Sequence, residues 1–189
     1  MSIINVVGAK IWGGGEQYVY DICKQLQQRH RTAYILVDQS NEDMQSRYAQ
    51  VGHVMTANLY TLKGFLSVNA VAKQMKEQGI NTIVCHSGKY ILFCIALKQL
   101  TGAKLVFIKH NLVPGKTDIY HRWINAQVDA FVCVSKLVYD DLMTPAIKDT
   151  SKYHVVYNGI DPNRFQSFSD AVPMKYKVRT FGYSARITE

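Results

Sequence analysis

Seven short runs rich in Val, Ile and aromatic residues alternate along the chain with longer segments of helical periodicity. This alternation is the pattern expected of βα units wound into one parallel sheet. The predicted strands are Ile3–Gly8, Ala33–Val37, His53–Ala57, Thr82–Cys85, Lys104–Ile108, Ala130–Val134 and His154–Tyr157. Several are apolar throughout, as strands covered on both faces should be. The sequence therefore predicts an α/β fold, a Rossmann-like doubly wound parallel sheet with flanking helices.

Apolar residues recur at helical spacing between the predicted strands, which predicts helices with one face in the core. The first such stripe consists of Tyr18, Val19, Ile22, Cys23 and Leu26. A later stripe consists of Ile119, Tyr120, Trp123 and Ile124. We expect both stripes to pack against the sheet, with contact to a ligand beside an open cleft as the alternative for the later one.

Composition excludes disordered and fibrous classes, because 48% of the 189 residues are hydrophobic and only 19% are charged. The N-terminus lacks the basic flank and cleavage site of a signal peptide. No apolar stretch approaches the roughly 20 residues that span a bilayer, so we expect a cytoplasmic protein. The four cysteines show no CxxC spacing and lie among apolar neighbours. That pattern favours reduced core thiols over disulfides or a metal site.

The net charge of +8 is spread evenly along the chain. Residues 1–100 carry ten Lys and Arg against six Asp and Glu, and the remaining residues carry twelve against eight. No basic tail or arm of the kind that binds nucleic acid is present, so we expect no nucleic-acid partner. The charge favours either a solvated basic surface or attraction to phosphate-bearing substrates and anionic lipid head groups, with peripheral contact to a membrane.

The character of the sequence changes after Tyr157. Turn-forming residues follow at Asn158, Gly159, Asp161 and Pro162, and a small, polar segment comes next. We therefore predict a first domain over residues 1–165, a linker over 166–176 and the first strand and loop of a second domain over 177–189. An isolated strand cannot bury a core, so we expect the chain to end just inside that second domain.

Ligands of open parallel sheets bind beyond the carboxyl ends of the strands, and Gly13, Gly14 and Gly15 follow the first predicted strand. They lead into a helix, and their free amides favour phosphate or hydroxyl groups. Their spacing departs from the GxGxxG pattern of dinucleotide-binding proteins. Because Asp38 ends the second predicted strand, where such folds hold a ribose-binding acid, a nicotinamide-dependent oxidoreductase remains an alternative.

Two histidines also follow predicted strands. His110 lies between Lys109 and Asn111, and His86 precedes Ser87. A histidine in such a position can hydrogen-bond a sugar hydroxyl or exchange a proton near neutral pH, and a purely structural role is the alternative. No GxSxG elbow surrounds Ser87, which argues against a hydrolase triad.

Five segments, in this order along the chain, resemble the retaining glycosyltransferases of family four. They are GGGEQYVYDICKQL, VCHSGKY, KLVFIKHN, VDAFVCVSKLVYDDL and VVYNGIDPNRF. The resemblance implies the N-terminal, acceptor-binding half of a two-domain GT-B fold. It further implies transfer of a sugar from a nucleotide sugar, with retention at the anomeric carbon and with neither a metal nor a further cofactor.

The resemblance also assigns roles to individual residues. His110 would contact the transferred sugar or the acceptor as the catalytic-site histidine, and Gly14 and Gly15 would border the acceptor and the donor phosphates. In the tail FGYSARITE, Arg186 matches an arginine that contacts the donor diphosphate, although Ala185 stands where the family has glycine. The predicted binding residues are Gly14, Gly15, His86, Lys109, Asn111, Ser135 and Arg186.

The implied acceptor is a glycan or a lipid-linked molecule, as in polysaccharide or glycoconjugate biosynthesis. With only a fragment of the donor site, the isolated chain is expected to be inactive. Its uncovered interdomain face is expected to favour self-association or a separate partner. A non-catalytic binding module, or one subunit of a split glycosyltransferase, is the main alternative function.

Overall fold

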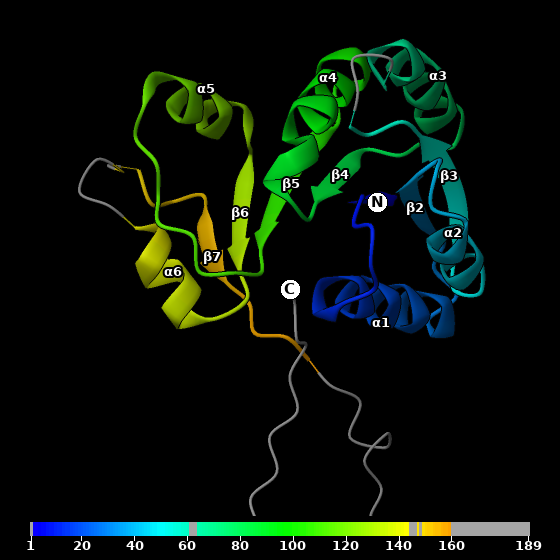
Figure 1. Ribbon diagram of the computed structural model, residues 1–189, viewed down its shortest axis with the longest axis horizontal. Helices are drawn as coiled ribbons and strands as arrows, with labels where there is room; N and C mark the ends of the chain where they lie inside the picture. The colour runs from blue at the N-terminus through cyan, green and yellow to red at the C-terminus, as the bar shows by residue number, and fades with distance from the viewer. Residues whose placement is uncertain (1, 61–63, 144–146, 148, 160–189) are drawn as a thin grey trace, which may run out of the picture. The chain divides into compact units, whose positions relative to one another are not determined.

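The sheet is built entirely from parallel pairs of strands (Figure 1). The computed structural model describes residues 2–60, 64–143, 147 and 149–159, without the side chain of Phe65. Within these residues seven strands form one sheet of order β3-β2-β1-β4-β5-β6-β7. The strands are β1 (Ile3–Val7), β2 (Ala33–Asp38), β3 (His53–Ala57), β4 (Thr82–Cys85), β5 (Lys104–Lys109), β6 (Ala130–Cys133) and β7 (Tyr153–Val155).

The strand order reverses beside β1. The chain first moves outward from β1 through β2 to β3, then returns to the other side of β1 and continues through β4 to β7. Asn5, in the middle of β1, is consequently paired with Ile35 of β2 and with Val84 of β4. A reversal of this kind opens a crevice at the carboxyl ends of the two strands, because their following loops diverge to opposite sides.

Helices connect the strands and cover both faces of the sheet (Figure 1). They are α1 (Gly14–Gln28), α2 (Glu42–Ala49), α3 (Gly64–Glu77), α4 (Ile91–Thr101), α5 (Ile119–Gln127) and α6 (Lys136–Leu142), with a 3-10 turn η1 (Gly88–Tyr90) before α4. Polar side chains begin several of them. The side chains of Asn41, Asp118 and Ser135 accept hydrogen bonds from backbone amides in the first turns of α2, α5 and α6.

Two separate hydrophobic clusters hold the helices to the sheet. Val19 and Cys23 of α1 and Tyr48 of α2 pack with Val7 of β1 on one face. The larger cluster lies on the other face and joins α3 and α4 to the sheet, and it continues to α5 and α6. Because neighbouring residues of a strand point to opposite faces, Val6 and Val7 enter different clusters. The predicted doubly wound architecture is thereby confirmed.

The predicted strands match the observed ones to within one or two residues at each end. All four cysteines are buried, as predicted. The predicted linker over 166–176 and the predicted strand and loop over 177–189 lie outside the described residues. Within the described ranges, none of the helices combines the length and the apolar character that a membrane span requires.

The expectation that the later apolar stripe packs against the sheet is wrong for three of its four residues. Ile124 is buried, but the exposed fractions are 87% for Ile119, 49% for Tyr120 and 47% for Trp123. The nine-residue helix α5 touches the core mainly through Ile124, and Val128 just after it supplies the next contact. The periodicity predicted the helix correctly, but three of the four apolar residues of the stripe face solvent.

Substitution of Gly52 is expected to destabilise the fold. A Cβ atom at this position would lie 2.7 Å from the backbone oxygen of Ala33 and 2.5 Å from Cδ1 of Ile35. Backbone of a central strand cannot move aside, so Gly52→Ala should lower the free energy of unfolding by about 1 to 3 kcal/mol in urea titrations. Gly14→Ala is the control, because nothing lies within 4 Å of its new Cβ atom. Equal stability of the two variants would contradict this packing.

Candidate functional site

Three polar side chains meet where the carboxyl ends of β1, β4 and β5 come together. Asn5 lies on β1, His86 directly follows β4 and His110 directly follows β5. The Nε2 atom of His86 is 3.1 Å from Oδ1 of Asn5, and the Nδ1 atom of His86 is 3.1 Å from Nε2 of His110. The two sequence-predicted histidines are therefore in direct contact, at the reversal of strand order.

A tyrosine from α1 closes one side of the histidine pair. The ring of Tyr18 meets the ring of His110 edge to face, with centroids 5.2 Å apart, and meets His86 in the same way at 6.2 Å. The two imidazole rings are nearly parallel, with an interplanar angle of 22° and centroids 5.4 Å apart, as fits the contact between their ring nitrogens. These contacts fix the orientation of both imidazoles. We refer to Asn5, Tyr18, His86 and His110 as the histidine cluster.

Burial keeps both imidazoles neutral at physiological pH. Loss of hydration, together with a smaller effect of the adjacent His110, lowers the pKa of His86 from 6.5 to about 3. Burial also lowers the pKa of His110 and raises that of the Tyr18 hydroxyl. A neutral imidazole with a depressed pKa is a weak base, so this arrangement suits hydrogen bonding to a ligand better than proton exchange near neutral pH.

Gly14 and Gly15 form the first turn of α1, the helix that carries Tyr18. No atom lies within 4 Å of a Cβ built on either glycine, so packing within this domain does not require them. Their bare backbone amides at the start of the helix are open to a ligand. Gly8, at the end of β1, differs from them, because a Cβ there would lie 2.8 Å from the ring of Tyr90.

The structure does not bring Lys109 into the histidine cluster. Lys109 lies on the face of the sheet that carries Phe107 and the larger cluster, whereas His110 contacts Tyr18 of α1 on the other face. Its Nζ atom lies over the ring of Phe107, 5.2 Å from the centroid, and burial lowers its pKa. Asn111 is exposed in the loop after β5.

Ser135 has a structural partner. Its hydroxyl oxygen accepts a hydrogen bond from the amide of Val138 at 3.2 Å and so caps α6. Ser87 similarly accepts from the amide of Lys89 at the start of η1. Ser135 is thus the N-cap of α6, shortly after β6, and Ser87 is the N-cap of η1, shortly after β4. Arg186 lies outside the described residues.

Both oxygen atoms of the Asp38 carboxylate accept hydrogen bonds from nearby residues of the same domain. One oxygen accepts hydrogen bonds from the amide and hydroxyl of Ser40, and the other accepts from the amide of Leu59 at 2.9 Å. Burial acts to raise the pKa of Asp38, but these hydrogen bonds and the charge of Lys10 outweigh it and lower the pKa. A carboxylate engaged in this way is poorly placed to bind a ribose, which weighs against the dinucleotide alternative.

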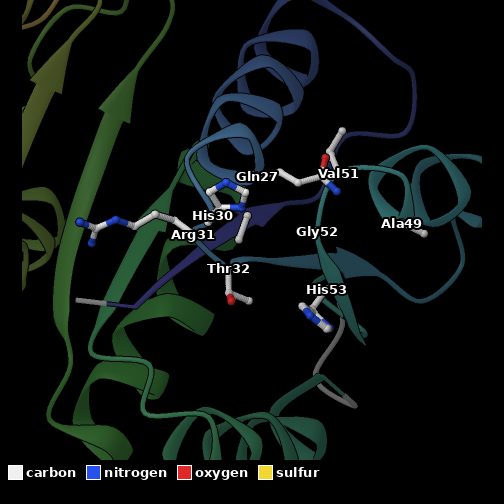
Figure 2. A pocket seen from close by; sticks show the side chains of 9 residues that line it. Gln27, His30, Arg31, Thr32, Ala49, Val51, Gly52 and His53 are labelled. Atoms are coloured by element: carbon white, nitrogen blue, oxygen red, sulfur yellow. The ribbon is translucent and has the colours of Figure 1, made fainter.

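A hollow of about 460 Å³ lies near the amino ends of β2 and β3, away from the histidine cluster (Figure 2). Gln27, His30, Arg31, Thr32, Ala33, Ala49, Val51, Gly52 and His53 line it. Figure 2 shows the side chain of Arg31 extending away from His53, so its polar groups do not converge on one point. Ligands of parallel sheets bind at the opposite end, and we do not assign a site here.

Sequence reasoning missed two members of the histidine cluster. Tyr18 was assigned to the core stripe of the first helix, but only Val19 and Cys23 of that stripe are fully buried. Asn5 was not recognised as a candidate site residue. A single amide among the Ile and Val residues of a predicted strand is nevertheless a signal of a buried hydrogen-bonding group. Among the described residues, no group of three or more His, Cys, Asp and Glu side chains is arranged to hold a metal ion.

The family model described as Glycosyltransferase Family 4 matches residues 12–164. No curated protein matches the chain. Among solved structures, the chain is similar to a glycosyltransferase from Rickettsia africae ESF-5, with a TM-score of 0.74, 18% identity and coverage of 86% of this chain and 44% of that one. It is also similar to Anabaena Alr3699/HepE in complex with UDP and glucose, with a TM-score of 0.68, 19% identity and coverage of 90% and 48%.

A third similar structure is MurG of Acinetobacter baumannii, with a TM-score of 0.57, 12% identity and coverage of 88% of this chain and 50% of that one. The chain thus spans about half the length of each of these three proteins. At such identities the likeness establishes the fold, which is the N-terminal half of a GT-B architecture.

The depressed pKa of His86 has a measurable consequence for stability. Between pH 6.5 and about 3, this histidine binds fewer protons in the folded protein than in the unfolded chain, so acidification across that window favours unfolding. The contribution is at most about 1.4 kcal/mol per pH unit for one group. Urea titrations from pH 7 to pH 5 should show a smaller loss for His86→Gln than for the unchanged protein. His154→Gln, at an exposed site on β7, is the control and should behave like the unchanged protein. Identical slopes for all three would refute the assignment.

Proposed function

The chain belongs to glycosyltransferase family 4, and from this membership we propose that it is the acceptor-side half of an enzyme that transfers a sugar from a nucleotide sugar. The single observation that carries the proposal is the contact between His86 and His110 at the reversal of strand order. Two neutral imidazoles, held by their mutual contact and by the ring of Tyr18, are suited to hydrogen-bonding the hydroxyl groups of a sugar or an acceptor.

We infer a nucleotide sugar as donor, bound mainly by a second domain. The similar Anabaena protein holds UDP and glucose, which supports this donor class without fixing which nucleotide or sugar is used here. Arg186 is proposed to contact the donor diphosphate, a role suited to a planar cation. The open amides of Gly14 and Gly15 are proposed to border the donor phosphates and the acceptor.

The proposed contribution of this domain to the reaction is positioning. His110 hydrogen-bonds the transferred sugar or the acceptor, while Tyr18 and His86 keep its ring in place. Because both histidines are neutral with lowered pKa values, no proton transfer is assigned to them. Closure of the two domains would align donor and acceptor and exclude water, with retention at the anomeric carbon.

The nicotinamide-dependent alternative is not proposed. Its ribose-binding acid would be Asp38, whose carboxylate is engaged by Ser40 and Leu59. The binding-module alternative predicts that the protein binds sugar but does not transfer it, whereas the main proposal predicts transfer. The acceptor is proposed to be a glycan or a lipid-linked molecule, as in polysaccharide or glycoconjugate synthesis.

The proposal is tested by sugar transfer from a panel of nucleotide sugars. We expect transfer by the protein translated from the whole reading frame, with an unchanged anomeric configuration in product NMR spectra, and none above background by the 189-residue chain alone. His110→Ala should lower kcat/KM about 100-fold, because a lost positioning contact misaligns the reactants. His154→Gln on β7 is the matched control and should leave transfer unchanged. Transfer that survives His110→Ala would overturn the role of His110, and binding without transfer would favour the binding module.

Peripheral contact with an anionic membrane is also proposed, because of the outward face of α5. Ile119, Tyr120 and Trp123 lie on one side of this helix and are exposed, and Arg122 and Lys116 beside them are exposed cations. Asp118 is the acid nearest to them in sequence, and its carboxylate pairs with His121 at 2.6 Å. Aromatic residues beside basic ones are typical of surfaces that bind the lipid headgroup region. A surface of this kind would bring the domain to a lipid-linked acceptor.

Cosedimentation with vesicles tests this contact. The chain should bind vesicles that contain anionic lipid and should bind neutral vesicles several-fold less, because Arg122 and Lys116 add attraction to the apolar contact. Trp123→Ala should weaken the binding. Leu66→Ser is the matched control, since Leu66 is 82% exposed on α3, away from this face. If both substitutions have the same effect, or if neutral and anionic vesicles bind equally, α5 is not the contact.

A further inference from the structure

Asn5 is an unusual residue for the centre of this sheet. Its side chain is only 3% exposed, and its neighbours Ile4 and Val6 are fully buried. A buried amide costs free energy unless its polar atoms have hydrogen-bond partners. One partner is weak, since Nδ2 donates to Sγ of Cys23 at 3.8 Å. The other is the imidazole of His86, 3.1 Å from Oδ1, and this is the stronger interaction of the amide.

The orientation of the Asn5 amide determines where the protons of both histidines lie. An amide oxygen only accepts, so Nε2 of His86 must carry the proton that it donates to Oδ1. A neutral imidazole carries one N–H proton, so Nδ1 of His86 is left with a lone pair. That lone pair faces Nε2 of His110 at 3.1 Å, so Nε2 of His110 must be the donor. His110, also neutral, then has its lone pair on Nδ1.

We propose that Asn5 is a positioning residue that fixes the tautomers of His86 and His110, so that Nδ1 of His110 is presented as a hydrogen-bond acceptor. No described residue hydrogen-bonds this nitrogen atom within the protein. A lone pair selects a ligand group that can donate, such as a sugar hydroxyl, and disfavours the diester oxygens of a diphosphate, which only accept. Asn5 acts through His86 and does not touch the ligand. This identification of the ligand group rests on the proposed function.

The reverse orientation of the amide would give the opposite result. Nδ2 would donate to Nε2 of His86, Nδ1 of His86 would donate to His110, and Nδ1 of His110 would carry a proton. Both proton orders satisfy every atom of the chain that links Asn5 to His110. The amide at the buried end therefore decides whether the ligand meets an acceptor or a donor, and the two cases are experimentally distinct.

The test is the tautomer of each histidine, measured without ligand by long-range ¹H–¹⁵N correlation spectra of the 189-residue chain labelled in histidine. At pH 8 we expect a single tautomer with the proton on Nε2 for both His86 and His110, each assigned by its own substitution. A proton on Nδ1 of His110 would overturn the proposal. This measurement uses the unchanged protein and needs no variant to fold.

The role of Asn5 is tested separately by Asn5→Val, which removes the amide and introduces a β-branched side chain of the kind that strands favour. Loss of one hydrogen bond should change the tautomer ratio of His86 and His110 by roughly 2- to 10-fold towards Nδ1–H. Thr82→Val is the matched control, because Thr82 is a buried polar residue of the neighbouring strand without contact to the histidines, and its ratio should not change. Unchanged tautomers in a folded Asn5→Val protein would show that Asn5 does not set them.

A final titration with glucose separates this inference from the proposed function. If Asn5 fixes the tautomers and the site binds sugar, glucose should shift the Nδ1 resonance of His110 in the unchanged protein and shift it several-fold less in Asn5→Val. Equal shifts in both proteins would overturn the positioning role. If the Nδ1 resonance of His110 does not respond to glucose in the unchanged protein, the proposal that His110 binds sugar is wrong. The role of Asn5 would still stand, because the tautomers are measured without ligand.

Discussion

Every strand of the sheet runs in the same direction, so each connection must carry the chain from the carboxyl end of one strand back to the amino end of the next. Helices make these crossings, and they bury their apolar faces on the two sides of the sheet. The same constraint collects all loops that follow a strand at one end of the domain. The candidate site is at that end because parallel pairing leaves no other place where residues that follow different strands can meet.

The reversal of strand order makes one point at that end different from the rest. The sheet grows outward from β1 in one direction and then in the other, so β1 and β4 are neighbours whose following loops diverge. His86 enters the gap from β4, His110 enters from β5 and Tyr18 enters from α1. With Asn5 of β1, the site thus draws on four elements of the chain. Its rigidity comes from ring contacts and from the sheet beneath it, as suits a positioning role.

Burial gives the site its chemical character. Imidazoles in water exchange protons near neutral pH, whereas those of His86 and His110 are held neutral by loss of hydration. Their use is then directional hydrogen bonding, in which each ring nitrogen is either a donor or an acceptor. A single buried amide, that of Asn5, connects this choice to the core of the sheet. Packing and ligand recognition are therefore parts of one network.

Local pattern predicted the elements well because helix and strand periodicities are properties of short segments. The strand ends were correct to within one or two residues, and His86 and His110 were recognised as residues that follow strands. Pattern alone misplaced Ile119, Tyr120 and Trp123, because periodicity reveals that a helix has an apolar face but not what that face meets. It also placed Lys109 and His110 together, although Lys109 lies over Phe107 on one face and His110 contacts Tyr18 of α1 on the other.

The sequence by itself determined the class of fold, the family and the residues at the ends of the strands. Each of these follows from the pattern of residues within short contiguous segments. Only the tertiary structure decided which of those residues touch. The contact between His86 and His110 joins residues 24 positions apart, and the contact between Asn5 and His86 joins residues 81 positions apart. The ring of Tyr18 meets His110, which lies further still along the chain. Such contacts depend on strand order and register, which are fixed by the packing of the whole sheet and not by any one segment.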